Sequence, residues 1–199
     1  MDGTFSYEPE PTRLPVPQRP VVPSAVLGTL IFIVSEVMFF AGTISAFTIS
    51  RANQLPGMWP PPGQPRLPAT ATAINTVALL LSGLLLVLAY RLWKRSATSA
   101  RWAYLGSWLL GATFVGLQGR EWQALLAEGM TVTSSTLGSF FYLIVGGHAV
   151  HALGALLLLG WGGIKLWQGT LSRGWFFGTQ AFWYFVVAMW PAIYARVYF

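Results

Sequence analysis

Long apolar runs separated by short polar segments make up most of this chain. Each run is longer than the roughly 20 residues that a helix needs to cross the hydrocarbon core of a bilayer. None shows the period-two alternation of a membrane β-barrel. The pattern predicts an all-α integral membrane protein with five transmembrane helices, at about residues 24–50, 71–93, 102–127, 136–164 and 175–198.

Composition supports a membrane environment. Hydrophobic residues are 54% of the 199 positions and charged residues only 9%, whereas about 25% are charged in typical soluble domains. The first 23 residues contain six prolines and charges of both signs, so they cannot propagate a helix. We therefore divide the chain into an extended N-terminal tail, residues 1–23, and a five-helix transmembrane domain, residues 24–199.

Lysine and arginine are distributed unequally between the two ends of the predicted bundle. Eight lie in the tail and at the ends of helices that face the same side, and four lie on the other side, at Arg51, Arg66, Arg120 and Arg196. Because the cytoplasmic side keeps the excess, we expect the N-terminus inside and the C-terminus outside. This topology also accounts for the pI near 10.1 without nucleic-acid binding.

The supply of metal-binding side chains is small. The chain has no cysteine, which excludes thiolate zinc sites, iron–sulfur clusters and disulfides, and it has only two histidines, His148 and His151. They are three residues apart in the fourth run and leave one side of that helix. With no third ligand nearby, we interpret them as neutral imidazoles that hydrogen-bond to a neighbouring helix, rather than as a metal site.

Glu36 lies within the apolar run FIVSEVMFFAGTISAF, residues 32–47. An ionised carboxylate at mid-bilayer costs about 3 kcal/mol on insertion scales, so it should face protein and either pair or hold a proton. It borders a stripe of small residues, Gly28, Ser35 and Gly42, which suits close helix packing. The candidate partners are Asn75, Thr76, Ser82, Gln118, Glu121, His148 and His151. Two roles for Glu36 fit this pattern. It is either a proton-linked group beside the histidines, able to influence proton access or bind a lipid head group, or a protonated acid that donates a hydrogen bond to another helix.

The third run ends in LQGREWQALLAEG, which places Gln118, Arg120, Glu121 and Trp122 close to the outer membrane interface. Charged residues beside a tryptophan at that depth are typical of an interfacial anchor. A polar contact with another subunit is the alternative. The many tryptophans of the last two runs are interpreted as belt or packing residues.

Several segments together resemble cytochrome c oxidase subunit III of the haem-copper oxidase superfamily, in its short five-helix form. They are SEVMFFAG, MWPPP, LQGREW, GSFFYLIVGGHAVHALGA and a last helix that contains FWYF, and the resemblance runs from about residue 26 to the end. It implies an accessory subunit without catalytic residues, redox centre, metal or cofactor of its own. Haem and copper would belong to partner subunits.

The resemblance also implies partners and residue roles. The chain would pack on oxidase subunit I, with subunit II in the same complex, hold phospholipids, and support proton uptake in a bacterial inner membrane. A larger respiratory supercomplex is a further expected partner. By position, Glu36 matches the family's buried carboxylate, Gln118 and Glu121 match its glutamine and acid near the end of a preceding helix, and His148 and His151 match its paired histidines.

The last helix departs from the family pattern, because Tyr184 and Val187 stand where a histidine and an aspartate are usual. This leaves fewer internal partners for Glu36 and favours a structural role. A subunit of a quinol oxidase or of a nitric oxide reductase would share the fold. A small transporter would usually show internal repeats, and a free-standing membrane enzyme would need a nucleophile or metal set that is not evident here.

Overall fold

The computed structural model describes residues 24–55 and 58–199, and these residues form five long helices. The predicted tail, residues 1–23, lies outside the described residues. The helices are α1 (Ser24–Ala52), α2 (Ala69–Trp93), α3 (Ala97–Ala127), α4 (Thr136–Trp167) and α5 (Arg173–Val197). The five predicted runs are therefore confirmed as helices, with ends that differ by a few residues.

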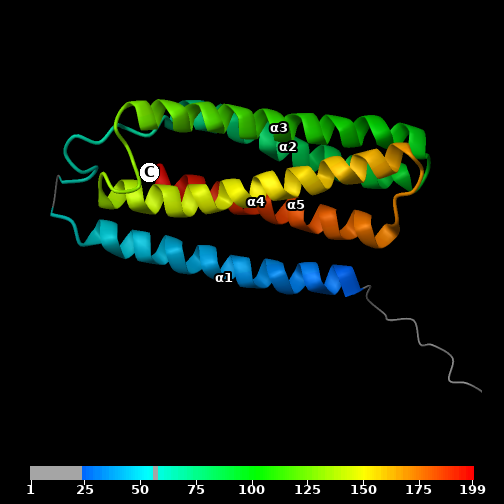
Figure 1. Cartoon of the computed structure of the whole chain (residues 1–199), viewed down its shortest axis with the longest axis horizontal. Helices are drawn as coiled ribbons and strands as arrows, with labels where there is room; N and C mark the ends of the chain where they lie inside the picture. The colour runs from blue at the N-terminus through cyan, green and yellow to red at the C-terminus, as the bar shows by residue number, and fades with distance from the viewer. Residues whose placement is uncertain (1–23, 56–57) are drawn as a thin grey trace, which may run out of the picture.

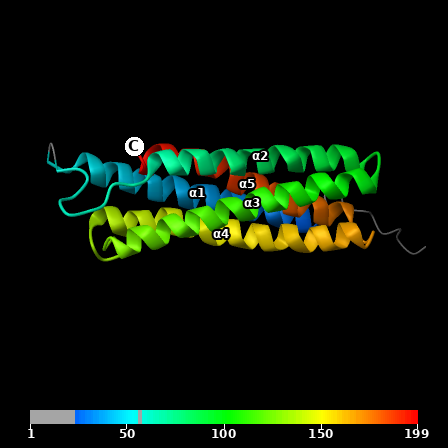
Figure 2. The same ribbon diagram turned by 90° about the horizontal axis from the view of Figure 1, so that it is seen from above.

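The helices lie side by side along one long axis (Figures 1 and 2). Helices α2 and α3 form the most extensively packed pair, and α5 packs against α4, α1 and α2. Within the described part of the chain, α1 packs only on α4 and α5, and Figure 1 shows it along the outer side of the bundle. One face of α1 is therefore left uncovered by the described residues.

Local signals set the helix ends. Gly129 and Gly169 have φ values of +88° and +74° just after α3 and α4, a left-handed conformation that glycine adopts without steric cost and that commonly ends a helix. Ser135 and Ser172 cap α4 and α5, because their hydroxyl oxygens accept hydrogen bonds from the backbone N–H groups of Gly138 (3.0 Å) and Trp175 (3.2 Å). Such caps satisfy N–H groups that the helix itself leaves unpaired.

Four of the helices, α1, α2, α4 and α5, are long and apolar enough to cross a membrane. Helix α3 is similar in length but less apolar, and it runs beside the others (Figure 2). Many large aliphatic side chains point outward, including Leu157, Met38 and Val150, which are about 70% exposed. This surface suits lipid or a partner subunit rather than water.

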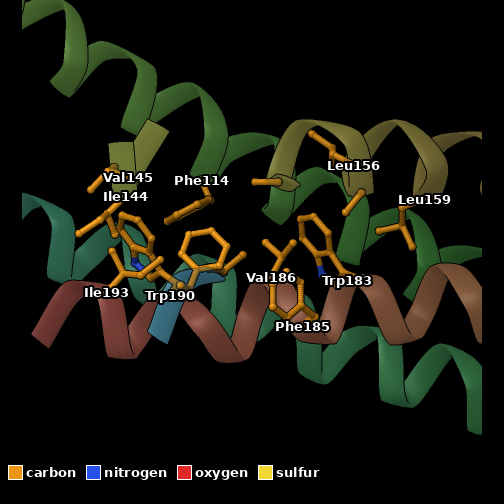
Figure 3. Close-up of a cluster of buried hydrophobic side chains, with 14 of the residues drawn as sticks. Phe114, Ile144, Val145, Leu156, Leu159, Trp183, Phe185, Val186, Trp190 and Ile193 are labelled. Atoms are coloured by element: carbon orange, nitrogen blue, oxygen red, sulfur yellow. The ribbon is translucent and has the colours of Figure 1, made fainter. Parts of the chain in front are cut away.

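The interior is built mainly from aromatic and small residues. Trp183 and Trp190 of α5 are fully buried and lie seven positions apart, so they face the same side of the helix. They pack among residues of α3 and α4 (Figure 3). Trp183 Nε1 donates to Ser82 Oγ (2.9 Å), and Trp190 Nε1 donates to Thr76 Oγ1 (2.8 Å). These tryptophans are packing residues that also tie α5 to α2.

Candidate functional site

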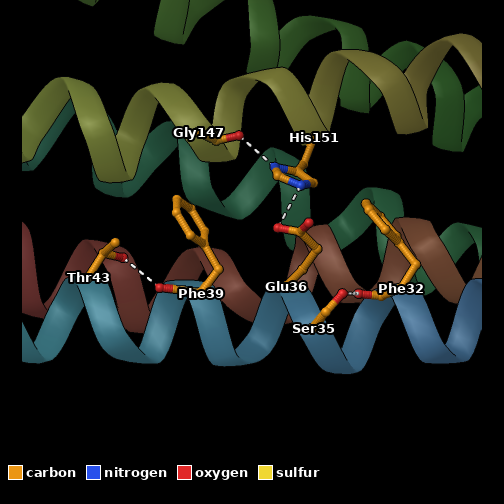
Figure 4. A network of polar contacts seen from close by, with 7 residues as sticks. All are labelled: Phe32, Ser35, Glu36, Phe39, Thr43, Gly147 and His151. Carbon is orange, nitrogen blue, oxygen red and sulfur yellow. Dashed lines mark hydrogen bonds and ion pairs between the residues drawn. The ribbon is translucent and has the colours of Figure 1, made fainter.

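Glu36 and His151 contact each other across the interface of α1 and α4. His151 Nε2 lies 3.0 Å from Glu36 Oε2, and Figure 4 shows the two side chains pointing toward one another. The His151 and Glu36 side chains are 16% and 20% exposed, respectively, so the pair lies largely inside the protein near the middle of both helices. Of the partners considered for Glu36, the structure thus selects His151.

The hydrogen bonds of His151 define where its protons lie. Its Nδ1 is 2.7 Å from the carbonyl oxygen of Gly147, and a carbonyl oxygen can only accept, so Nδ1 carries a hydrogen. A proton is then needed between Nε2 and Oε2, because two bare acceptors would repel each other at 3.0 Å. It resides on either the imidazole or the carboxyl group, and the pair is electrically neutral in both forms.

Four phenylalanines surround the imidazole of this pair. Phe32 and Phe40 of α1 lie four residues before and after Glu36, so the three side chains share one helix face. Their rings lie 6.0 and 5.6 Å from the His151 ring, and those of Phe182 and Phe185 of α5 lie 6.3 and 6.0 Å away. An apolar shell of this kind lowers the local dielectric and strengthens the hydrogen bond between the pair.

His148 has different surroundings. It is 1% exposed, and its ring lies 5.1 Å from the Trp190 ring and 6.2 Å from that of Phe40. Neither ring nitrogen has a hydrogen-bond partner among the described residues. The interpretation that both histidines hydrogen-bond to a neighbouring helix is therefore right for His151 and wrong for His148. Aromatic rings occupy the space around the His148 imidazole.

Gln118 and Glu121 belong to a second polar cluster, separate from the Glu36–His151 pair. Gln118 Nε2 donates to Glu121 Oε2 (3.0 Å) and to the hydroxyl of Tyr198 (3.2 Å). Glu121 Oε2 also accepts from Thr72 Oγ1 (2.7 Å), and Gln118 Oε1 accepts from Asn75 Nδ2 (3.4 Å). The cluster joins α2, α3 and the residue that follows α5, so Glu121 is more than an interfacial anchor.

The remaining partners considered for Glu36 bond elsewhere. Thr76 and Ser82 accept from the two buried tryptophans of α5, and Asn75 donates to the Phe114 carbonyl oxygen (3.1 Å). These candidates do not pair with Glu36, because the polar face of α2 is turned toward α3 and α5 and α1 does not contact α2.

The small-residue stripe of α1 does not pack on another of the described helices. A Cβ atom added at Gly28 or Gly42 would meet nothing within 4 Å, and Ser35 is exposed, with its hydroxyl bonded to the Phe32 carbonyl oxygen of its own helix (2.7 Å). Close packing along this stripe remains a prediction that concerns a partner outside the chain.

The two departures in α5 do not lie against Glu36. A Cβ atom added at Gly83 of α2 would approach Val187 Cγ1 to 3.1 Å, so Val187 faces α2. The hydroxyl of Tyr184 accepts a hydrogen bond from Gln180 Nε2 (2.6 Å) within α5. The Glu36–His151 pair forms without either residue.

Thr72 and Tyr198 were missed by the reasoning from sequence, although both bond to the predicted cluster residues. Thr72 lies three residues before Asn75, a spacing that places both on one helix face and could have indicated it. Nothing in the local sequence around Tyr198 indicates its role.

Over residues 24–55 and 58–199, no group of three or more His, Cys, Asp or Glu side chains could hold a metal ion.

Comparison with known proteins gives consistent matches over nearly the whole chain. The family model described as cytochrome c oxidase subunit III matches residues 17–199. The chain is 32% identical over 181 residues to a probable cytochrome c oxidase subunit 3 of Nocardia farcinica, covering 87% of this chain and 86% of the relative. Identity and coverage are the same for the protein of that name from Mycobacterium leprae.

A plant relative, cytochrome c oxidase subunit 3 of Arabidopsis thaliana, is 32% identical over 179 residues, which are 86% of this chain and 66% of the relative. The matched region includes α1 to α5 and thus both polar clusters. The chain therefore belongs to the cytochrome c oxidase subunit III family and is an accessory subunit of that respiratory oxidoreductase.

Proposed function

We propose that this subunit supports proton uptake by the oxidase through the Glu36–His151 pair, while it packs beside the catalytic subunit I in a complex that includes subunit II. The haem and copper of the reaction lie in those partner subunits. The complex resides in a bacterial inner membrane, with the N-terminus of this chain inside, and it can join a larger respiratory supercomplex.

The 3.0 Å contact between His151 Nε2 and Glu36 Oε2 carries this proposal. Since Nδ1–H is held by the Gly147 carbonyl oxygen, the shared proton can move between Nε2 and Oε2 without changing the net charge of the pair. A neutral pair avoids most of the cost of an isolated charge in hydrocarbon. When the pair passes this proton to an acceptor it is left with one negative charge, and the uptake of a new proton restores the neutral form.

The exposed surface supports the packing and lipid-holding parts of the proposal. Helix α1 leaves one face uncovered, with the stripe Gly28, Ser35 and Gly42 along it. Small residues permit a second helix to approach closely in a membrane. We assign this face to the neighbouring oxidase subunit and the outward aliphatic side chains of the other helices to bound phospholipid.

The test compares Glu36→Gln with the wild-type chain in the purified oxidase complex. Glutamine can donate a hydrogen bond to His151 Nε2, so we expect one copy of the chain per catalytic subunit as before. Proton uptake per electron should fall modestly, since the shared proton is lost. Thr43→Ala is the control, because this hydroxyl of the same helix donates to the carbonyl oxygens of Phe39 and Phe40 in its own helix.

Two results would contradict the proposal. Proton uptake equal to that of the wild type would show that the carboxyl group is not proton-linked, and loss of assembly would show that it is structural. The isolated chain should also lack haem absorbance in the visible range. Tightly bound intrinsic haem would refute its assignment as a subunit without a redox centre.

A further inference from the structure

Two adjoining grooves lie at the end of the bundle where α1 and α5 end. One, of about 550 Å³, runs between the last turns of these helices and includes Phe47, Arg51 and Arg196. The other, of about 330 Å³, lies against the loop before α2 and includes Arg66. Arg51 and Phe199 line both grooves, so the two form one continuous surface depression.

Three arginines from separate segments of the chain thus meet at one depression. Arg51 lies in the last turn of α1, Arg66 lies in the loop and Arg196 lies in the last turn of α5. Over residues 24–55 and 58–199, the ion pair within 4.0 Å joins Glu36 and His151, near the middle of the bundle. No carboxylate of those residues lies that close to the three guanidinium groups. None of the three therefore forms an ion pair within the described part of the chain.

Helix-end charge and membrane topology each account for only part of this arrangement. A cation in the last turn stabilises a helix through its dipole. This applies to Arg51 and Arg196 but not to Arg66, which lies in the loop. The positive-inside rule places most cations at the cytoplasmic end of the bundle, opposite to this one. Of the four arginines at this outer end, three line the depression and Arg120 does not. A shared anion accounts for all three.

The lining indicates an amphipathic anion. Arg51 lies over the Trp59 ring, 5.6 Å from its centroid, and Trp59 packs on Phe47 with the ring centroids 5.6 Å apart, which orients the guanidinium group. Guanidinium groups suit phosphate oxygens, which they can bind through paired N–H donors. Phe47, Ala52, Ala195 and Phe199 supply apolar surface beside them, where an acyl chain can lie.

We infer that this depression binds one anionic phospholipid, with its phosphate at Arg51, Arg66 and Arg196 and an acyl chain along the seam of α1 and α5. The inference rests on the lipid-holding part of the proposed function and names a site and a lipid class for it. It does not involve the Glu36–His151 pair.

The experiment uses the whole oxidase complex, stripped of lipid in mild detergent and titrated with phosphatidylglycerol, with bound lipids counted by native mass spectrometry. The variant is Arg51→Gln/Arg196→Gln, and the matched control is Arg120→Gln at the same end of the bundle. We expect the double variant to bind one phosphatidylglycerol fewer, with affinity at this site about tenfold lower or more, as for lost hydrogen bonds to charged groups. The control should bind as the wild type does, and Arg51→Lys/Arg196→Lys should keep part of the affinity.

Each contrary outcome overturns the inference. Equal phosphatidylglycerol binding by the double variant, or equal affinity of the wild type for phosphatidylcholine, would show that the arginines select no anionic lipid. Loss of a neighbouring subunit with the lipid count unchanged would mean that they bind a partner's carboxylates. If the wild-type complex binds no phospholipid anywhere, the lipid-holding part of the proposed function fails as well. If the wild type and the double variant bind phospholipid equally, only the inference about this site is contradicted.

Discussion

Glu36 Oε2 of α1 lies 3.0 Å from His151 Nε2 of α4, and phenylalanine rings of α1 pack around the imidazole. Their contact is the polar link between α1 and the rest of the bundle on which the proposed function depends. The same contact should also contribute to the free energy of unfolding of the chain.

We expect Glu36→Leu and His151→Leu to destabilise the chain singly by about 1–3 kcal/mol, because each leaves a largely buried polar partner unpaired. The double variant should cost less than the sum of the two, since both polar groups are then gone. Thermal unfolding of the four proteins in one detergent measures the coupling. Strictly additive losses would contradict a direct bond.

Gly111 of α3 is predicted to be needed for packing of Trp183. A Cβ atom at position 111 would lie 2.6 Å from Trp183 Cζ2, and the ring is fully buried and bonded to Ser82, so it has no room to move. Gly111→Ala should therefore destabilise the chain by about 1–3 kcal/mol, as for an overpacked core.

The matched control for this substitution is Gly116→Ala on the same helix, where a Cβ atom would meet nothing within 4 Å. It should be neutral or slightly stabilising, because alanine favours a helix more than glycine does. The comparison is made on the thermal unfolding midpoint. Equal midpoints for the two variants would show that the Trp183 ring yields easily.

Gln118 is predicted to stabilise the end of the bundle that carries the second cluster. Gln118→Leu removes its hydrogen bonds to Asn75, Glu121 and Tyr198 and leaves polar groups without that partner, at a cost of about 1–3 kcal/mol for each one that stays buried. Hydrogen exchange in the last turn of α5 should rise, because Tyr198 loses its partner. Gln123→Leu, at an exposed position of α3, is the control and should leave that exchange unchanged.

The predicted membrane orientation can be tested cleanly, because the chain has no cysteine. Single cysteines at Ser96, between α2 and α3, and at Thr133, between α3 and α4, lie at opposite ends of the bundle and are both exposed. A membrane-impermeant thiol reagent added to intact cells should label Thr133→Cys and spare Ser96→Cys. The reverse pattern would invert the topology.

The sequence alone determined the elements and the kind of chemistry available. Apolar run length predicts the helices to within a few residues, because crossing hydrocarbon is a local requirement on each segment. The absence of cysteine and the presence of two histidines are likewise properties of the chain itself. Glu36 and His151 could both be singled out because charged or titratable groups are costly in an apolar run.

Tertiary structure alone decided which of these groups meet. The expected polar residues divide into two clusters, since Glu36 reaches His151 while Gln118 and Glu121 join Thr72 and Tyr198. His148 packs among aromatic rings instead of finding a hydrogen bond. The physical reason is that helix order and the rotation of each helix about its axis depend on how all five surfaces fit together, and no single segment encodes that fit.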